Sequence, residues 1–356
     1  MKTFHCTHCQ NLVFFENDRC LNCGYVLAYV AEQSKMVALE HGQDGLWRSA
    51  SNNVQSNTYR LCANHSQQDV CNWAVAADDP EALCRSCRLT KIIPNLTPPG
   101  NRASWYRLET AKRRLIYSLV NMGLPVVTKT AQAPSGLQFE FLADSTEPNG
   151  DSKRVFTGHD NGLITINIAE ADAVLREQQR QRQNEPYRTL LGHFRHEIGH
   201  YYWDQLIQNS PRLEAFRKIF GDERASYEEA LKRHYAGGPP AQWEQYFISA
   251  YATMHPWEDW AETWAHFLHM TDALETAGAV GLSLKPGRSD EPSMSPPATS
   301  LTGRHDGFDR MIAEWIALTY VMNNLSRGLG LPDSYPFVLS PAVIDKLRFI
   351  HDTVAA

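Results

Sequence analysis

The sequence predicts an α+β protein, in which a mainly helical core with a small sheet follows a small cysteine-rich domain. All eight cysteines fall within the first 87 of the 356 residues, so this part of the chain differs in kind from the rest. Residues 138–142 and 163–168 are predicted strands, and in the second of them isoleucine alternates with other residues, which is the period of a half-buried strand. From residue 189 onward the chain is predicted to be mainly helical.

The composition is ordinary for a folded soluble protein, with 43% hydrophobic and 21% charged residues and a net charge of −6. It excludes a wholly disordered chain, a collagen-like repeat and a coiled coil. No apolar run approaches the roughly 20 residues that a membrane helix needs, and a cysteine pair begins at Cys6, before the apolar core of a signal peptide could form. We therefore expect a cytoplasmic protein with no membrane partner, and its mild acidity argues against general nucleic-acid binding.

Two C-x-x-C pairs, separated by ten residues, open the chain. A tight turn within each pair can direct two thiolates toward one ion, and the second pair completes a tetrahedral shell. Disulfides are disfavoured because nothing in the sequence indicates export. We therefore predict a structural zinc site, and we expect His5 and His8 to be exposed neighbours because four thiolates already satisfy the metal. The predicted ligands are Cys6, Cys9, Cys20 and Cys23.

A second set of four cysteines is more loosely spaced but still contains one C-x-x-C pair. Such a set can close another four-thiolate zinc site, and His65 could replace Cys62 as its first ligand. The alternative is a group of reactive or merely buried thiols. The predicted ligands are Cys62, Cys71, Cys84 and Cys87, which gives two structural zinc sites in a zinc-ribbon region over residues 1–93.

The charge of this region indicates what kind of partner it could take. Residues 1–100 carry 8 basic and 9 acidic side chains. Each tetrathiolate zinc centre would add a further −2, which brings the total to about −5. Since affinity for nucleic acid depends on cationic contacts with phosphate, we expect no nucleic-acid partner, and a protein-docking or scaffolding role is favoured.

The rest of the chain divides at segments rich in proline and glycine. Three prolines and one glycine in residues 94–100 predict a linker. Residues 281–304 crowd Pro, Ser and Gly without periodicity, which predicts a flexible surface loop. The predicted organisation after the cysteine-rich region is a linker over 94–100, a core over 101–280, a flexible loop over 281–304, and C-terminal helices over 305–356 that complete the core.

Three helices are predicted outside the central part of the chain. The first is capped by Ser104 and runs through Asn121. Its leucines form one apolar stripe, and the basic run 112–114 is expected on the opposite, solvent-exposed face. The other two are predicted over 308–324 and, after a Ser-Pro start, over 341–353.

Residues 193–204, which read HFRHEIGHYYWD, carry the pattern with the strongest chemical meaning. His196 and His200 are four residues apart, so on a helix they lie one turn apart and can reach one ion. Glu197 would stand at the edge of that site, where it can take a proton from a metal-bound water, as in zinc hydrolases with H-E-x-x-H. Metzincins are excluded because Trp203 and Leu206 stand where they need Gly and His.

A second helix, predicted over 251–269, offers further ligands. Glu258, Glu262 and His266 recur every four residues on one stripe, while tryptophans occupy another, and buried carboxylates are costly unless they are paired or metal-bound. Glu258 could bind zinc while Glu262 holds a ligand histidine by its other ring nitrogen. Glu262 and His266 remain alternative ligands, and His193 is expected to be structural or to support a ligand.

The cysteine-rich start followed by HEIGHYYWD and PWEDWAETWAHFLH resembles a bacterial family described as "putative zinc-binding metallopeptidases", which have an N-terminal zinc-ribbon domain. The core also resembles gluzincins of the Mlc-titration-factor and anthrax-lethal-factor type. In those proteins a tyrosine seven residues before the ligand glutamate helps to stabilise the transition state. Tyr251 precedes Glu258 by seven, so the resemblance implies Glu258 as the ligand, Tyr251 as a catalytic residue, and Glu262 as the alternative.

Together, the residues and the resemblance predict a zinc metallopeptidase that cleaves a peptide or protein substrate. One catalytic zinc, held by His196, His200 and Glu258, would accompany the two structural ones; Glu197 would be the general base, and Tyr251 would hydrogen-bond the oxyanion. The strand at 163–168 could pair with an extended peptide. The alternative is a non-catalytic, ribbon-based binding protein whose core is a scaffold, but such a protein would have no use for Glu197.

Overall fold

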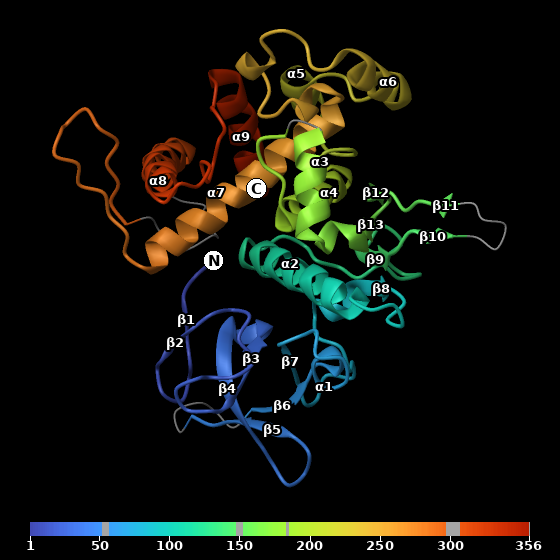
Figure 1. The fold of residues 1–356 in the computed structure, drawn as a ribbon, viewed down its shortest axis with the longest axis vertical. Helices are drawn as coiled ribbons and strands as arrows, with labels where there is room; N and C mark the ends of the chain where they lie inside the picture. Colours follow the sequence, from blue (N-terminus) through green and yellow to red (C-terminus); the bar gives the residue numbers. More distant parts are fainter. Residues whose placement is uncertain (52–56, 147–151, 183–184, 297–306, 356) are drawn as a thin grey trace.

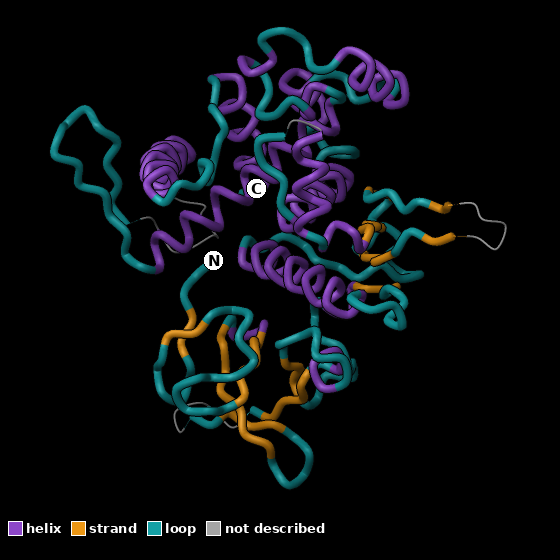
Figure 2. Tube along the Cα trace, viewed as in Figure 1, coloured by secondary structure: helices purple, strands orange, loops and turns teal. Residues whose placement is uncertain are grey.

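The computed structural model describes residues 1–51, 57–146, 152–182, 185–296 and 307–355. It confirms the α+β class: strands dominate the first quarter of the chain, and helices dominate the rest (Figures 1 and 2). The strands are β1 (Phe4–His5), β2 (Leu12–Val13), β3 (Val26–Val30), β4 (Lys35–His41), β5 (Trp47–Ser49), β6 (Thr58–Leu61), β7 (Ala74–Ala76), β8 (Thr90–Ile92), β9 (Gln138–Leu142), β10 (Ser145–Thr146), β11 (Ser152–Lys153), β12 (Gly158–Asp160) and β13 (Leu163–Asn167). The helices are α1 (Ala63–Ser66), α2 (Asn101–Asn121), α3 (Ala173–Arg182), α4 (Leu190–Leu206), α5 (Leu213–Phe220), α6 (Tyr227–Gly237), α7 (Pro256–Ala279), α8 (Phe308–Gly328) and α9 (Pro341–Val354).

The N-terminal region is built on an antiparallel sheet of order β3-β4-β5-β6-β7, accompanied by the β1-β2 hairpin. Its core is an aromatic cluster in which Phe15 and Tyr29 lie against Trp73. The Tyr117 ring of α2 joins this cluster at 5.5 Å from the Phe15 ring. The N-terminal region therefore packs directly on α2, which lies between it and the helical part of the molecule (Figure 1).

A second sheet of order β12-β13-β9-β8 lies beyond α2 and contains both predicted strands, as β9 and β13. β13 is antiparallel to β12 over Leu163–Thr165 and parallel to β9 along its length. Asn167, at the end of β13, is bonded to Thr157 and Val155. Because β13 is occupied on both sides, the expectation that it pairs with an extended peptide is wrong. The free edge of the sheet at this end belongs to β12.

The basic run on α2 is not a solvated face, which corrects the prediction for 112–114. Lys112 is fully buried and its Nζ lies 2.9 Å from a carboxylate oxygen of Glu109. Arg113 is buried as well and donates to the carbonyl of Val70 at 2.6 Å. The prediction failed because both faces of α2 are covered, one by the N-terminal region and the other by the second sheet and α4, so only Arg114 keeps partial exposure.

Helices α4 and α7 cross at a very short distance, and this crossing positions the residues of interest. A Cβ atom on Gly199 would lie 2.9 Å from the Cα of Ala261, so only glycine fits there. The indole nitrogen of Trp260 donates to the Gly199 carbonyl at 2.8 Å, and Tyr202 stacks on Trp264. The close approach holds the two helices in a fixed register.

The C-terminal helices α8 and α9, both predicted, pack against α7 (Figure 1). A buried ion pair between Lys346 of α9 and Asp259 of α7, at 2.6 Å, helps to fix this packing. The loop predicted over 281–304 lies partly outside the described residues; its described part contains no helix and is closed by backbone bonds between Leu284 and Met294. Within the described segments, none of the helices combines the length and apolar character that crossing a bilayer requires.

Candidate metal centre

The crossing of α4 and α7 brings together His196, His200 and Glu258, as the sequence predicts. The Nε2 atoms of the two histidines are 3.2 Å apart. Glu258 Oε2 lies 3.0 Å from His196 Nε2, and Oε1 lies 3.6 Å from His200 Nε2. Donors bonded to a tetrahedral zinc at 2.0–2.1 Å stand roughly 3.3 Å apart. These separations therefore fit a single zinc ion held by three protein ligands.

Glu258 supplies a second sign that the cluster suits a cation. Its side chain is buried, at 2% exposure, and its Oε2 atom receives no well-aligned hydrogen bond from the described residues. A carboxylate in that position is costly without a positive partner. A divalent cation between this oxygen and the two imidazoles would satisfy it.

Glu262 lies one turn further along α7 and holds His196 from the opposite side. Its Oε1 atom is 2.7 Å from His196 Nδ1, and its Oε2 atom accepts a hydrogen bond from Ser249 at 2.6 Å. Burial raises the pKa of Glu262, but the hydrogen bond and charge of His196 outweigh burial and bring the pKa to about 2. This contact orients the His196 ring so that Nε2 faces Glu258. Carboxylates that bind the second ring nitrogen of a metal-binding histidine usually orient the ring in this way.

The other two histidine candidates lie elsewhere. His266 Nδ1 is 2.7 Å from the Tyr335 hydroxyl, and His193 Nδ1 is 3.0 Å from Glu170. Neither belongs to the three-residue cluster.

Glu197 and Tyr251 stand beside the cluster. Glu197 is buried, and burial raises its pKa, although the neighbouring histidines act in the opposite direction. Tyr251 lies in a 3-10 turn (Tyr251–Thr253) just before α7, with its ring 5.9 Å from that of His196. Burial and the charge of Glu258 raise the pKa of Tyr251, so its hydroxyl remains a hydrogen-bond donor over the physiological range.

Three further side chains adjoin the cluster without any motif in the sequence to mark them. The Tyr227 hydroxyl, at the start of α6, donates to Glu258 Oε1 at 2.9 Å. His234 of the same helix packs edge-on against Tyr251, with ring centres 5.9 Å apart. His159 of β12 stacks on His200 at 6.2 Å. These three residues cannot be identified from the sequence, because each contact joins separate elements and follows no helical or strand period.

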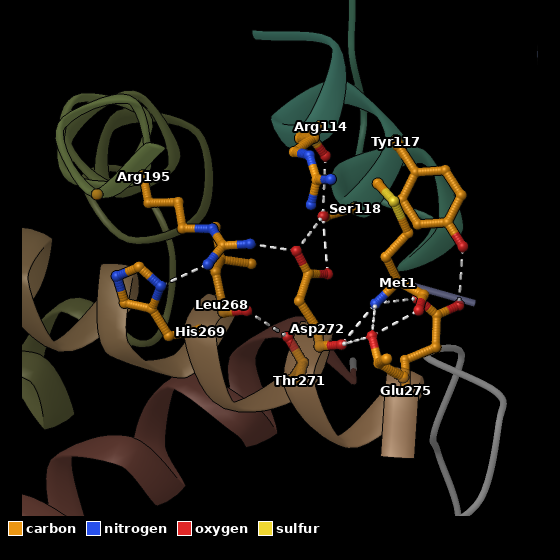
Figure 3. Close-up of polar contacts among 12 residues, drawn as sticks. Met1, Arg114, Tyr117, Ser118, Arg195, Leu268, His269, Thr271, Asp272 and Glu275 are labelled. Carbon is orange, nitrogen blue, oxygen red and sulfur yellow. Dashed lines mark hydrogen bonds and ion pairs between the residues drawn. The ribbon is translucent and has the colours of Figure 1, made fainter. Parts of the chain in front are cut away.

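Arg195 anchors the helix that carries the two histidines. It is buried, and its guanidinium contacts His269 and Asp272 of α7 (Figure 3). Ser118 of α2 donates to the same Asp272 carboxylate at 2.8 Å. Beside it, Glu275 accepts from the Tyr117 hydroxyl and lies 2.9 Å from the Met1 nitrogen. The network in Figure 3 therefore ties α4 to α7, to α2 and to the start of the N-terminal region.

All eight cysteines are free thiols and form two groups of four. The measured Sγ–Sγ separations are 3.7 Å for Cys6 and Cys23, 3.6 Å for Cys9 and Cys20, and 3.8 Å for Cys71 and Cys84. Four thiolates bonded to one zinc at 2.3 Å would stand about 3.8 Å apart. Both groups therefore fit tetrahedral zinc.

The second cysteine group is the more deeply buried, and Cys62 belongs to it whereas His65 does not. Both ring nitrogens of His65 lack a hydrogen-bond partner among the described residues. Beside the first group, His5 and His8 are both exposed, as predicted, and His8 Nδ1 lies 3.0 Å from the Ala50 carbonyl oxygen. None of these histidines completes either group.

The roles of the two glutamates of α7 can be separated by substitution. Glu258→Ala is expected to abolish zinc binding at the three-residue cluster because it removes a ligand. Glu262→Ala is expected to weaken zinc binding about 10- to 100-fold, because it removes only the support of His196. Zinc content by elemental analysis and zinc affinity by chelator competition measure both effects. The reverse order would transfer the ligand role to Glu262.

Comparison with known families gives two matches. Residues 101–353 match the family described as "Putative zinc-binding metallo-peptidase", and residues 3–98 match a zinc-ribbon domain. Uncharacterized proteins of Mycobacterium tuberculosis strain H37Rv and of Mycobacterium bovis are each 43% identical over 356 residues, covering 99% of this chain and 95% of the relative. No solved structure matches.

Proposed function

This chain belongs to the Putative zinc-binding metallo-peptidase family, and from that premise we propose that it hydrolyses peptide bonds with a zinc ion held by His196, His200 and Glu258. The observation that carries the proposal is the convergence of these three side chains, with the unsatisfied oxygen of Glu258 between them. A purely structural role would not explain why one oxygen of this buried carboxylate, Oε2, lacks a well-aligned donor among the described residues.

The chemistry divides between the ion and the side chains around it. Zinc, when bound, lowers the pKa of a water molecule and polarises the carbonyl of the scissile bond. Glu197 follows the first ligand in the sequence and would accept the proton of the attacking water and pass it to the leaving amine. Its raised pKa suits that exchange, because a general base works best with a pKa near the operating pH.

Tyr251 supplies the second catalytic group. Its hydroxyl remains protonated and its ring lies 5.9 Å from that of the ligand His196, so it would donate a hydrogen bond to the oxyanion of the tetrahedral intermediate. A tyrosine seven residues before the ligand glutamate is the arrangement in gluzincins of the Mlc-titration-factor and anthrax-lethal-factor type, and we assign the core to that type.

We propose a peptide or protein substrate that enters along β12. Among the described strands β12 pairs only with β13, so its outer edge can accept an extended peptide. His159 of β12 stacks on His200, which places this edge beside the cluster.

The remaining proposals concern the N-terminal region and the whole chain. Two structural zinc ions, one per cysteine group, would give three per chain. The groups leave no cysteine for disulfides, which suits a cytoplasmic location. We assign the zinc-ribbon region to residues 1–93. We also propose that this region binds a protein partner.

A peptide library tests the function directly. The zinc-loaded chain is expected to cleave a subset of library peptides, cleavage sites being identified by mass spectrometry. A chelator should abolish cleavage, and zinc but not magnesium should restore it. A chain that holds three zinc ions and cleaves nothing would favour a scaffold role instead.

A further inference from the structure

We infer that Tyr227 is a positioning residue that holds Glu258 in the orientation in which it binds the metal. This inference rests on the proposed zinc site but not on peptide hydrolysis. The Tyr227 hydroxyl donates to Glu258 Oε1 at 2.9 Å, while Oε2 faces His196 Nε2 at 3.0 Å. Oε1 therefore has a neutral donor besides lying 3.6 Å from His200 Nε2, whereas Oε2 faces only His196 at the metal-binding position.

No other residue shares this task in the described part of the chain. Among the described residues, the only hydrogen bond to the Glu258 carboxylate from outside the two histidines comes from Tyr227. A carboxylate without it could rotate about its terminal bond and present either oxygen, or both, to the ion. A donor fixed on Oε1 removes that freedom, so it favours a single binding mode before the ion arrives.

The tyrosine itself is held in place from the start of α7. Its ring packs against those of His255 and Trp257, with centres 5.3 and 6.5 Å away. His255 caps α7 through the Trp257 amide, and its other nitrogen lies 3.0 Å from the carbonyl oxygen of Ala225, two residues before Tyr227. Glu258 lies in the first turn of α7. The contacts around the start of α7 therefore position both the ligand Glu258 and its hydrogen-bond donor Tyr227.

The rest of α6 makes few contacts. Among its residues only Ala230 is buried, and its two tyrosines, Tyr227 and Tyr235, are exposed to 37% and 67%. The bond from Tyr227 to Glu258 is therefore a principal link between this helix and the cluster.

The test is Tyr227→Phe, which keeps the ring and removes only the hydroxyl, with Tyr235→Phe on the same helix as the matched control. We expect Tyr227→Phe to weaken zinc affinity at the catalytic cluster about 10- to 100-fold in chelator competition. In the cobalt-loaded protein it should also change the visible absorption of the metal, whereas Tyr235→Phe leaves affinity and spectrum as in the wild-type chain. Both variants should keep the circular dichroism spectrum of the wild-type chain, since the packing of the ring is kept.

Unchanged affinity and an unchanged cobalt spectrum in Tyr227→Phe would overturn the positioning role. Equal losses in both variants would overturn it as well, because they would reflect a general effect on α6. A wild-type chain that binds only the two ribbon zinc ions would instead refute the proposed catalytic site. A third zinc without peptide cleavage would refute the peptidase proposal and leave the role of Tyr227 intact.

Discussion

The Glu197→Gln variant is expected to retain three zinc ions and to hydrolyse peptides about 10²- to 10⁴-fold more slowly than the wild-type chain. Glutamine has the same size and can occupy the same buried position, but it cannot accept a proton from water. The zinc ligands His196 and His200 keep their positions because the helix α4 is fixed against α7 at Gly199. The measurement is the rate of cleavage of a peptide identified in the library, with zinc content determined on the same sample.

Glu170→Gln is the matched control for this experiment. Glu170 is buried to the same degree as Glu197, at 8% exposure, and contacts His193 on the same helix, yet it lies outside the cluster. The Glu170→Gln variant should therefore retain most of the peptidase activity. Equal losses in the two variants would show that an amide in this region disturbs α4, and an active Glu197→Gln variant would refute the general-base assignment.

The Cys84→Ser variant is expected to lose one zinc ion and most of the stability of the N-terminal region. Structural zinc in zinc-finger peptides contributes on the order of 10–16 kcal/mol, which is comparable to the whole unfolding free energy of a typical domain. The effect should reach the helical part, since Cys87 of the same group lies 3.9 Å from Glu109 of α2, which also pairs with the buried Lys112. Elemental analysis and thermal unfolding followed by circular dichroism measure both effects.

His65→Ala is the control, because the structure places His65 outside the group. It should keep three zinc ions and a melting temperature close to that of the wild-type chain. If it lost zinc while Cys84→Ser did not, the composition of the second site would have to be revised.

Elements and residues that recur with a regular spacing can be predicted from the sequence. The H-E-x-x-H spacing and the four-residue stripe on α7 identify the side chains that meet at the cluster. The alternation in 163–168 predicts β13, the apolar stripe after Ser104 predicts α2, and the Ser-Pro start at residue 340 predicts α9. The ligand roles within the cluster remain predictions until metal binding is measured.

Features that depend on contacts between distant segments cannot be predicted in this way. Lys112 and Arg113 lie in a polar run whose burial can be understood only once the N-terminal region covers α2. Tyr227 reaches Glu258 across 31 positions of sequence, and no local pattern marks it. The five-stranded sheet β3-β4-β5-β6-β7 was also not predicted, because the cysteine spacing indicates metal sites but says nothing of how the strands between them pair.

Strand β8 bears on how such chains can be recombined. The two family matches meet between residues 98 and 101, but β8 precedes that point and pairs with β9 of the second sheet, where Lys91 also contacts Glu140 at 3.2 Å. A chimera joined at residues 94–100 would exchange an edge strand together with the ribbon, and a fragment cut there would expose the edge of β9 to pairing with other chains. The natural crossover point therefore lies directly before β8 and after Cys87, so that the last cysteine pair stays with its group.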